Sequence, residues 1–258
     1  MRMVEVRKAS KSFGGLSALK DVDLGMEDGE IRGLIGPNGA GKTTLFNLMA
    51  GNYRADSGSF LFDGQEMFGL GIDERVSLGI VRTFQNIRLF GSMTVLDNVK
   101  MGFHCRASTG WLSAAFNLRR SAREEAWMAS EGERLLDELD LLPHRGEQAK
   151  NLSYGNQRRL EIARALATRP RLLMLDEPAA GMNESEGRQL LDRIRAIRRS
   201  GITILVVEHD MNLLMTVSDR VTVLAHGQKI AEGTPAEVQT DGRVIAEYLG
   251  READASGH

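Results

Sequence analysis

The sequence has a single cysteine, almost no net charge and no hydrophobic run long enough to span a bilayer. Cys105 cannot form a disulfide within the chain, and no cysteine cluster has metal-ligand spacing, which favours a reducing compartment and leaves oxygen ligands for any metal. With 33 Lys and Arg against 35 Asp and Glu, the chain lacks the broad basic surface of a nucleic-acid-binding protein. The longest strongly apolar run, 202–207, is far shorter than a membrane span, so we expect a cytoplasmic chain.

The composition is that of an ordinary soluble globular protein. Of the 258 residues, 42% are hydrophobic and 26% are charged, which excludes disordered and fibrous classes. A chain of this length can form one large domain, or a core with one insertion, around a substantial apolar centre. No internal repeat or low-complexity linker divides it, so we expect one domain over 1–258 with a flexible tail at 251–258.

The N-terminal third predicts short strands, and then a strand, a glycine loop and a helix in succession. Segments 4–7 and 18–24 are candidate strands bounded by glycine-containing turns. A further apolar run, 31–35, ends in Gly36, and a helical pattern begins at Lys42.

The middle of the chain predicts helices. Thr94 and Ser121 each stand three residues before an acid, a pattern typical of helix starts. The segment 121–142 is rich in Ala, Glu, Arg and Leu, with leucines at helical spacing. We therefore expect a mainly helical insertion over about 88–152, followed by a helix that begins after Ser153.

The last third predicts alternating strands and helices. Segments 172–175, 202–207 and 221–225 are short continuous apolar runs, as expected of strands buried on both faces. Between the first two lies an amphipathic helix with Leu190 and Ile194 on its apolar side. Strands that alternate with helices indicate a parallel α/β sheet.

Residues 36–43 carry the clearest chemical signal of the chain. They read Gly-Pro-Asn-Gly-Ala-Gly-Lys-Thr and fit the phosphate-binding pattern G-x-x-x-x-G-K-[ST], between an apolar strand and a helix as the mechanism requires. The glycines let backbone N–H groups turn toward phosphate oxygens, and the helix N-terminus adds positive potential. We expect Lys42 to reach the β and γ phosphates of ATP and Thr43 to offer its hydroxyl to Mg²⁺.

Two acids, Asp176 and Glu177, end the apolar strand predicted at 172–175. Carboxylates at the end of a buried strand are costly without a cation or a polar site. Taken alone, they would more often cap a helix, but the phosphate loop upstream favours a catalytic reading. Asp176 is then the partner of Mg²⁺, and Glu177 the general base that polarises the attacking water.

Together with these two motifs, further short motifs resemble those of the ATP-binding-cassette (ABC) ATPases, in the same order and over almost the whole chain. They are a Q-loop glutamine at Gln85, a signature sequence at 152–157, a D-loop at 180–183 and a switch histidine at His209. Each motif is weak by itself, whereas the ordered set is very specific.

The resemblance implies an α/β fold, with a P-loop NTPase core that has a mainly parallel sheet, an N-terminal antiparallel β region and an inserted α-helical subdomain. It implies a core over 1–87 and 160–250 and a helical and signature subdomain over 88–159.

The resemblance also assigns roles to residues. Glu177, His209 and Gln85 are the implied catalytic residues, and Gln85 joins Thr43 and Asp176 as an implied Mg²⁺ ligand. The implied nucleotide-binding set is Phe13, Gly36, Pro37, Asn38, Gly39, Ala40, Gly41, Lys42, Thr43 and Thr44. The implied signature set, which contacts ATP bound by a partner subunit, is Ser153, Tyr154, Gly155, Asn156 and Gln157. Phe13 is implied to stack on adenine, and a buried core phenylalanine is the alternative reading.

Some residues depart from the general family pattern. Tyr154 and Asn156 replace the usual Gly and Gln of the signature, and Asn183 stands where an Asp is common in the D-loop. Two readings account for the departures, slower hydrolysis or membership of a subfamily. We favour the subfamily, because the signature segment, the D-loop segment and the Q-loop segment 82–90 resemble those of branched-chain amino-acid uptake ATPases. The long helical insertion, with Trp111 inside it, is similar to that of the larger of the two ATPases in such systems.

The function implied by the resemblance is ATP binding and hydrolysis, with ATP and Mg²⁺ as cofactors, in an ABC complex that imports branched-chain or related hydrophobic amino acids. Implied partners are a second ABC ATPase subunit, transmembrane permease subunits and a periplasmic or extracellular substrate-binding protein, with no nucleic acid. The chain would lie peripherally on the cytoplasmic face of the inner membrane, and the apolar residues of 85–90 would dock a permease helix. Alternatives are the ATPase of a lipid, lipopolysaccharide or other transporter, a soluble ABC ATPase acting on ribosomes or DNA, and a different P-loop enzyme such as a small-molecule kinase or GTPase.

Overall fold

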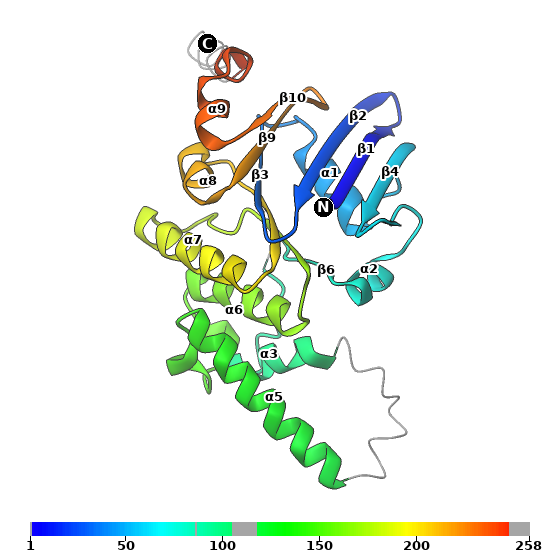
Figure 1. Ribbon diagram of the computed structural model, residues 1–258. Coiled ribbons are helices and arrows are strands. Elements are labelled where there is room, and N and C mark those ends of the chain that lie inside the picture. The colour runs from blue at the N-terminus through cyan, green and yellow to red at the C-terminus, as the bar shows by residue number, and fades with distance from the viewer. Residues whose placement is uncertain (1, 86, 105–117, 248–258) are drawn as a thin grey trace.

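An antiparallel sheet forms the N-terminal side of the molecule. The computed structural model describes residues 2–85, 87–104 and 118–247, and Figure 1 shows this sheet beside the first helix. Its strand order is β2-β1-β4-β5, with β1 Arg2–Phe13, β2 Leu16–Glu27, β4 Ser57–Phe62 and β5 Gln65–Glu66. The predicted strands 4–7 and 18–24 lie inside β1 and β2, which are longer because β1–β2 pairing continues on either side through buried residues such as Ala9 and Met26 as well as exposed polar ones.

A six-stranded sheet forms the centre, in the order β10-β9-β3-β8-β7-β6. Its strands are β3 Ile31–Ile35, β6 Ile80–Arg82, β7 Leu172–Asp176, β8 Thr203–Val207, β9 Arg220–Ala225 and β10 Gln228–Gly233. All neighbours pair in parallel except β9 with β10, so the predicted parallel α/β sheet is confirmed and one antiparallel strand is added at its edge. Every residue of β3, β7 and β8 is buried, as their continuous apolar sequence predicts.

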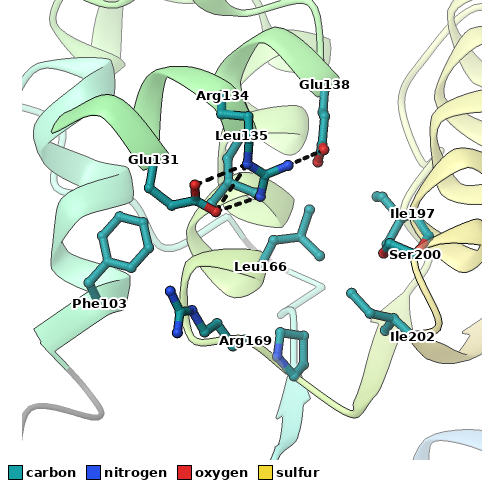
Figure 2. A pocket seen from close by; sticks show the side chains of 11 residues that line it. Phe103, Glu131, Arg134, Leu135, Glu138, Leu166, Arg169, Ile197, Ser200 and Ile202 are labelled. Carbon is teal, nitrogen blue, oxygen red and sulfur yellow. Dashed lines mark hydrogen bonds and ion pairs between the residues drawn. The ribbon is translucent and has the colours of Figure 1, made fainter. Parts of the chain in front are cut away.

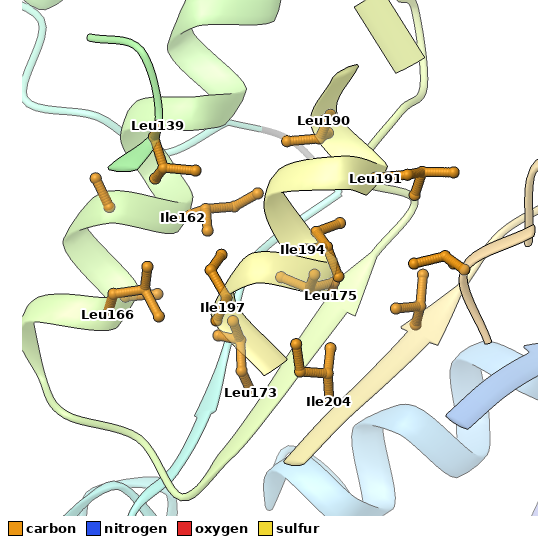
Figure 3. Packing of buried hydrophobic residues seen from close by; sticks show 14 of the residues in the cluster. Leu139, Ile162, Leu166, Leu173, Leu175, Leu190, Leu191, Ile194, Ile197 and Ile204 are labelled. Carbon is orange, nitrogen blue, oxygen red and sulfur yellow. The ribbon is translucent and has the colours of Figure 1, made fainter. Parts of the chain in front are cut away.

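Two hydrophobic clusters cover the two faces of this sheet. One lies toward the antiparallel sheet and α1 Lys42–Ala50, and it takes Leu172 and Met174 from β7. The other takes Leu173 and Leu175 from the same strand and packs them under the helices. Figure 3 shows the apolar side of α7 Glu184–Arg199 lying against these strand residues. The remaining helices of this part of the chain are α2 Ile72–Leu78, α8 Met211–Val217 and α9 Pro235–Thr240.

The helical region extends from one end of the central sheet (Figure 1). It comprises α3 Val95–His104, α5 Leu118–Glu138, the 3₁₀ helices Leu142–His144 and Ala149–Asn151, and α6 Tyr154–Ala167. The helix start predicted at Thr94 is confirmed, because Thr94 Oγ1 accepts a hydrogen bond of 3.0 Å from the Asp97 N–H. In the described parts of the chain, no helix is both long enough and apolar enough to cross a membrane.

The helix start predicted at Ser121 is wrong, because Ser121 lies inside α5, which begins at Leu118. A serine three residues before an acid also fits the face of a continuing helix, so the pattern alone does not locate a start. The predictions for Cys105, Trp111 and the tail 251–258 fall outside the described residues.

Candidate functional site

The phosphate-binding loop connects β3 to α1, and its backbone leaves no room for side chains at two glycines. Gly36 has φ +150°, and a Cβ placed there would lie 2.1 Å from the Leu224 carbonyl oxygen. Gly41 has φ +99°, and a Cβ there would lie 2.7 Å from the Ala18 carbonyl oxygen. Only glycine fits both positions, so the loop can bring its backbone N–H groups and the N-terminus of α1 close to an anion.

Lys42, the first residue of α1, folds back over this loop. Its side chain is only 5% exposed, and Nζ donates to the carbonyl oxygens of Gly36 at 2.5 Å and Pro37 at 3.0 Å. Thr43 and Thr44 follow it, the first exposed and the second half-buried. The charge is therefore positioned over the concave side of the loop, where a triphosphate would meet it.

A cavity of about 320 Å³ opens at the loop. It is lined by Phe13, Leu16, Ser17, Ala18, Asn38, Gly39, Ala40, Gly41, Lys42, Thr43, Thr44 and His209. Phe13 is 44% exposed, and its ring makes an edge contact with Tyr53 at 5.2 Å between centroids. This exposure contradicts the buried-core reading of Phe13 and leaves its ring available at the rim of the cavity.

We expect Phe13→Ala to weaken ATP binding about tenfold, because an aromatic ring stacked on a base contributes ~1–3 kcal/mol. Affinity for inorganic triphosphate should stay within about twofold, since the phosphate loop is untouched. Titration of the variant with both ligands measures the difference. Equal losses for both ligands would mean that Phe13 supports the loop and does not contact adenine.

Gln85, Glu177 and His209 meet at the carboxyl ends of the central strands. Gln85 Nε2 lies 3.4 Å from Glu177 Oε2, and His209 Nε2 is paired with Glu177 Oε1. Glu177 follows β7 with φ +49°, a left-handed conformation that is uncommon for a residue with a Cβ. Its N–H donates to the Val207 carbonyl at 2.9 Å and continues the pairing of β7 with β8. Two side chains that lie 124 positions apart in the sequence, Gln85 and His209, thus converge on the carboxylate of Glu177.

Asp176 ends β7 with a carboxylate that is almost fully buried. The residue is 5% exposed, and its Oδ2 lies 3.9 Å from Arg82 Nη2. Burial raises the pKa of the Asp176 carboxyl, and the Arg82 charge opposes that increase. A buried acid with one distant ion-pair partner among the described residues is suited to binding a cation.

The signature residues begin α6, and local bonds fix their backbone. Ser153 is the N-cap, and its Oγ accepts a hydrogen bond of 3.3 Å from the Asn156 N–H. Gln157 Nε2 donates to the Leu152 carbonyl at 3.0 Å. The side chain of Tyr154 is exposed. A Cβ added at Gly155 would make only ordinary van der Waals contacts, the nearest at 3.9 Å. Among the residues that the structure describes, none of the signature set lines the cavity at the phosphate loop.

Comparison with known proteins decides the family. A model described as "ABC transporter" matches residues 19–180, which is more than half of the chain. The chain belongs to the ABC transporter family. A second model, described as "Branched-chain amino acid ATP-binding cassette transporter", matches residues 228–254. The predicted fold class and ATP hydrolase activity are thereby confirmed.

Relatives of this ABC transporter family member cover nearly its full length. The high-affinity branched-chain amino acid transport ATP-binding protein LivG of Escherichia coli K12 is 42% identical over 96% of this chain and 98% of its own. The corresponding protein BraF of Pseudomonas aeruginosa is also 42% identical, over 96% and 98%. A crystal structure of a nucleotide-free ATP-binding cassette from an ABC transporter matches with a TM-score of 0.83 and 31% identity, over 96% of this chain and 99% of that one.

A second cavity, of about 420 Å³, lies between α5, α6 and α7 (Figure 2). Arg134 on its wall is paired with Glu131 and Glu138, and Leu135 and Leu166 supply apolar surface. No residue of the predicted site lines it.

Three charged residues that support the site were not predicted from the sequence. Arg82 faces Asp176, and Arg158 binds the backbone of the Q-loop. Glu208 is buried beside His209 and accepts a hydrogen bond of 2.9 Å from the Ala179 N–H, while burial raises the pKa of its carboxyl. Only Glu208 had a visible signal, as an acid directly after an apolar strand.

Asn183, the D-loop departure, has a local role. Its Oδ1 accepts a hydrogen bond of 3.0 Å from the Glu186 N–H, and Glu186 Oε2 accepts one of 3.1 Å from the Asn183 N–H. This reciprocal cap begins α7. Since Asn and Asp are similarly good N-caps, the cap accounts for an amide at this position in the ABC transporter fold.

Proposed function

We propose that this chain is the ATP-hydrolysing subunit of an ABC complex that imports branched-chain or related hydrophobic amino acids. The observation that carries the hydrolytic role is the convergence of Gln85, Glu177 and His209, with His209 also lining the cavity at the phosphate loop. The choice of substrate is supported by the names of the relatives that match over nearly the whole chain and by the family match at 228–254.

In the proposed reaction, water attacks the γ-phosphorus of ATP, the bond to the β–γ bridging oxygen breaks, and ADP leaves with that oxygen. Glu177 takes the proton of the attacking water as general base. The phosphate-loop N–H groups and Lys42 stabilise the charge on the β and γ phosphates. Gln85 and His209, which both contact the Glu177 carboxylate, position that carboxylate. In this proposal both side chains also contact the γ-phosphate.

Mg²⁺ fits the donor set of the site, with Thr43, Asp176 and Gln85 as the residues that would hold it. The buried Asp176 carboxylate and the exposed Thr43 hydroxyl are the hard oxygen ligands that this ion prefers. In the described part of the chain, no three His, Cys, Asp or Glu side chains cluster as a metal site. Such a cage is not needed, because Mg²⁺ usually retains waters and shares its ligands with the nucleotide. When bound, the ion would neutralise charge on the phosphates.

A second cassette completes each ATP site in this proposal. Ser153 caps the N-terminus of α6 and Gly155 lies in its first turn, where backbone N–H groups can bind an anion. The cavity at this chain's own phosphate loop is lined by none of the signature residues among those described. We therefore assign the signature to the γ-phosphate of ATP held by a partner subunit, which is either a second copy or a paralogous ATPase.

The permease partner would dock beside the Q-loop. A groove of about 300 Å³ lies where the helical region meets the core, lined by Val76, Val81, Arg82, Phe84, Phe90, Met101, Gly102, Glu161, Arg164, Ala165 and Thr168. Phe90 is 45% exposed there, whereas Leu89 packs against the buried core. Of the apolar residues considered for docking, Phe90 is thus the one that presents its ring at the surface.

We expect Phe90→Glu to abolish coupled transport in the assembled complex while the basal ATPase activity of the subunit stays within about twofold, since Phe90 lies outside the catalytic residues. A charge in the groove makes a desolvated helix contact costly. Ile72→Glu is the matched control, because Ile72 is also exposed, at 49%, but does not line the groove. Loss of folding in the Phe90 variant, seen by thermal melting, would instead assign Phe90 to the core.

The proposed location is the cytoplasmic face of the cell membrane, where the permeases would hold the subunit and a periplasmic or extracellular binding protein would deliver substrate. Affinity purification of the tagged chain from its native membrane tests this directly. Two permeases together with a leucine-binding protein among the co-purifying chains would support the proposal. A lipid-export permease would overturn the substrate, and the absence of any membrane partner would overturn the transport role.

A further inference from the structure

One buried arginine of the signature helix binds the backbone of the Q-loop. Arg158 lies on α6, and its side chain is 3% exposed. Its Nη1 donates to the Phe84 carbonyl oxygen at 2.6 Å, and its Nη2 donates to the carbonyl oxygen of Gln85. The residues joined in this way are 74 and 73 positions apart in the sequence. The guanidinium therefore holds two consecutive peptide groups, one of which belongs to Gln85, a residue of the proposed catalytic set.

The planar guanidinium suits this task in a way that lysine does not. Its two terminal nitrogens diverge in a fixed fork that reaches two acceptors at once, whereas the three N–H donors of an ammonium all sit on one nitrogen and have no fixed planar geometry. Glu161, one turn along α6, compensates the buried charge with an oxygen 3.2 Å from Nη1. The other oxygen of Glu161 accepts the Phe84 N–H at 3.4 Å, so the pair binds both sides of that residue. Because a buried ion pair is by itself weak evidence for stability, we take the backbone contacts of this pair as evidence that it fixes the local geometry.

The same helix also touches the loop that follows the general base. Tyr154 Oη accepts a hydrogen bond of 3.1 Å from Arg158 Nη2. The Tyr154 ring lies against Gly181, where an added Cβ would be 3.0 Å from Cε1 of the ring. The loop that carries Gly181 begins directly at Glu177, whose carbonyl oxygen accepts the Ala180 N–H at 3.1 Å. The first turns of α6 thus contact both the Q-loop, which carries Gln85, and the loop that follows Glu177.

We propose that Arg158 is a positioning residue that ties the signature helix to the Q-loop, so that ATP held by the signature on a partner subunit sets the position of Gln85 in this chain's own site. The inference rests on the proposed shared-site function. Ser153 and Gly155, which would grip the partner's γ-phosphate, lie within one to two turns of Arg158 on α6. Any displacement of the start of α6 must carry the Phe84 and Gln85 carbonyls with it or break their bonds.

Two variants test whether Arg158 positions Gln85. Both are made in the full-length chain and assayed with its partner cassette where one is needed for activity. Arg158→Lys keeps the charge beside Glu161 but loses the fork. Arg158→Gln combined with Glu161→Gln removes both buried charges together, so that neither is left unpaired. We expect both variants to lower kcat about tenfold and to reduce the Hill coefficient for ATP toward one. The dissociation constant for ATP at the phosphate loop should stay within about twofold.

The decisive readout is non-additivity with Gln85. In a Gln85→Ala background, replacing Arg158 should change kcat by less than about twofold, because the side chain that Arg158 positions is already gone. Arg159→Gln is the matched control, since Arg159 neighbours Arg158 on α6 but donates to Gln189 at 3.1 Å, and among the described residues it has no hydrogen bond to the Q-loop. This control should leave kcat and the Hill coefficient unchanged.

Each outcome bears on the proposal. The positioning role of Arg158 would be wrong if replacing Arg158 lowered kcat equally in the wild-type and Gln85→Ala chains, or if Arg158→Lys left kcat unchanged. Either result would leave the proposed function intact. If the charge-free double variant fails to fold, Arg158→Lys still decides the question. A wild-type chain that shows no ATPase activity with its partner would overturn the proposed function, and the tie with it.

Discussion

Lys42→Ala is expected to abolish ATP turnover, with kcat/KM lowered by at least about 10³-fold. The Lys42 charge is held over the phosphate loop by the Gly36 and Pro37 carbonyls and is almost fully buried. A charge that fixed hydrogen bonds hold in place is already oriented toward the phosphates, so its removal leaves their negative charge without that stabilisation. We also expect weaker ATP binding, because the same charge contacts the ground-state phosphates.

Nucleotide titration and a phosphate-release assay together measure this effect. The control is Lys20→Ala, since Lys20 is exposed on β2 and does not line the cavity at the loop. Thermal melting distinguishes a chemical loss from unfolding. An unchanged affinity and an unchanged rate would remove the phosphate-loop assignment.

The second large effect is expected for Glu177→Gln, which should slow hydrolysis by ~10²–10⁴-fold while leaving ATP binding intact. The amide has the shape of the carboxylate and can still meet Gln85 and His209, but it cannot take a proton from water. Asp176 remains in place for Mg²⁺, so the nucleotide should bind as in the wild type. The measurement is single-turnover phosphate release alongside equilibrium ATP binding.

Glu184→Gln serves as the control for this change, because Glu184 is an exposed carboxylate at the start of α7. Its removal should leave the rate within about twofold. A Glu177→Gln chain that hydrolyses ATP at the wild-type rate would show that another group is the base.

The sequence predicted those elements whose residue types are required by their own backbone conformation or burial. The phosphate loop could be predicted from its sequence pattern, because Gly36 and Gly41 have backbone conformations and close neighbours that only glycine tolerates. The strands β3, β7 and β8 could be read because burial on both faces demands uninterrupted apolar residues. The helix start at Ser121 was misplaced because the pattern used for it also occurs inside helices.

The contacts that connect the site could not be predicted in the same way. Arg158 reaches carbonyls more than 70 positions away, and Arg82 meets Asp176 across neighbouring strands. Nothing in the spacing along the chain indicates which arginine of an arginine-rich helix is buried. The exposure of Phe13 could not be predicted either, since a phenylalanine in a strand is more often part of a core.

The mass in solution of the Glu177→Gln chain, measured by light scattering with and without ATP and Mg²⁺, tests the central claim of a shared ATP site most directly. Without hydrolysis, the signature contact to the facing γ-phosphate persists, so ATP should convert monomers to a dimer, either of this chain alone or with its partner cassette. Adding Ser153→Arg to the same chain should prevent the dimer while ATP still binds, because the bulky charge blocks the signature. A variant that binds ATP without hydrolysing it, yet stays monomeric even with the partner cassette present, would contradict the account.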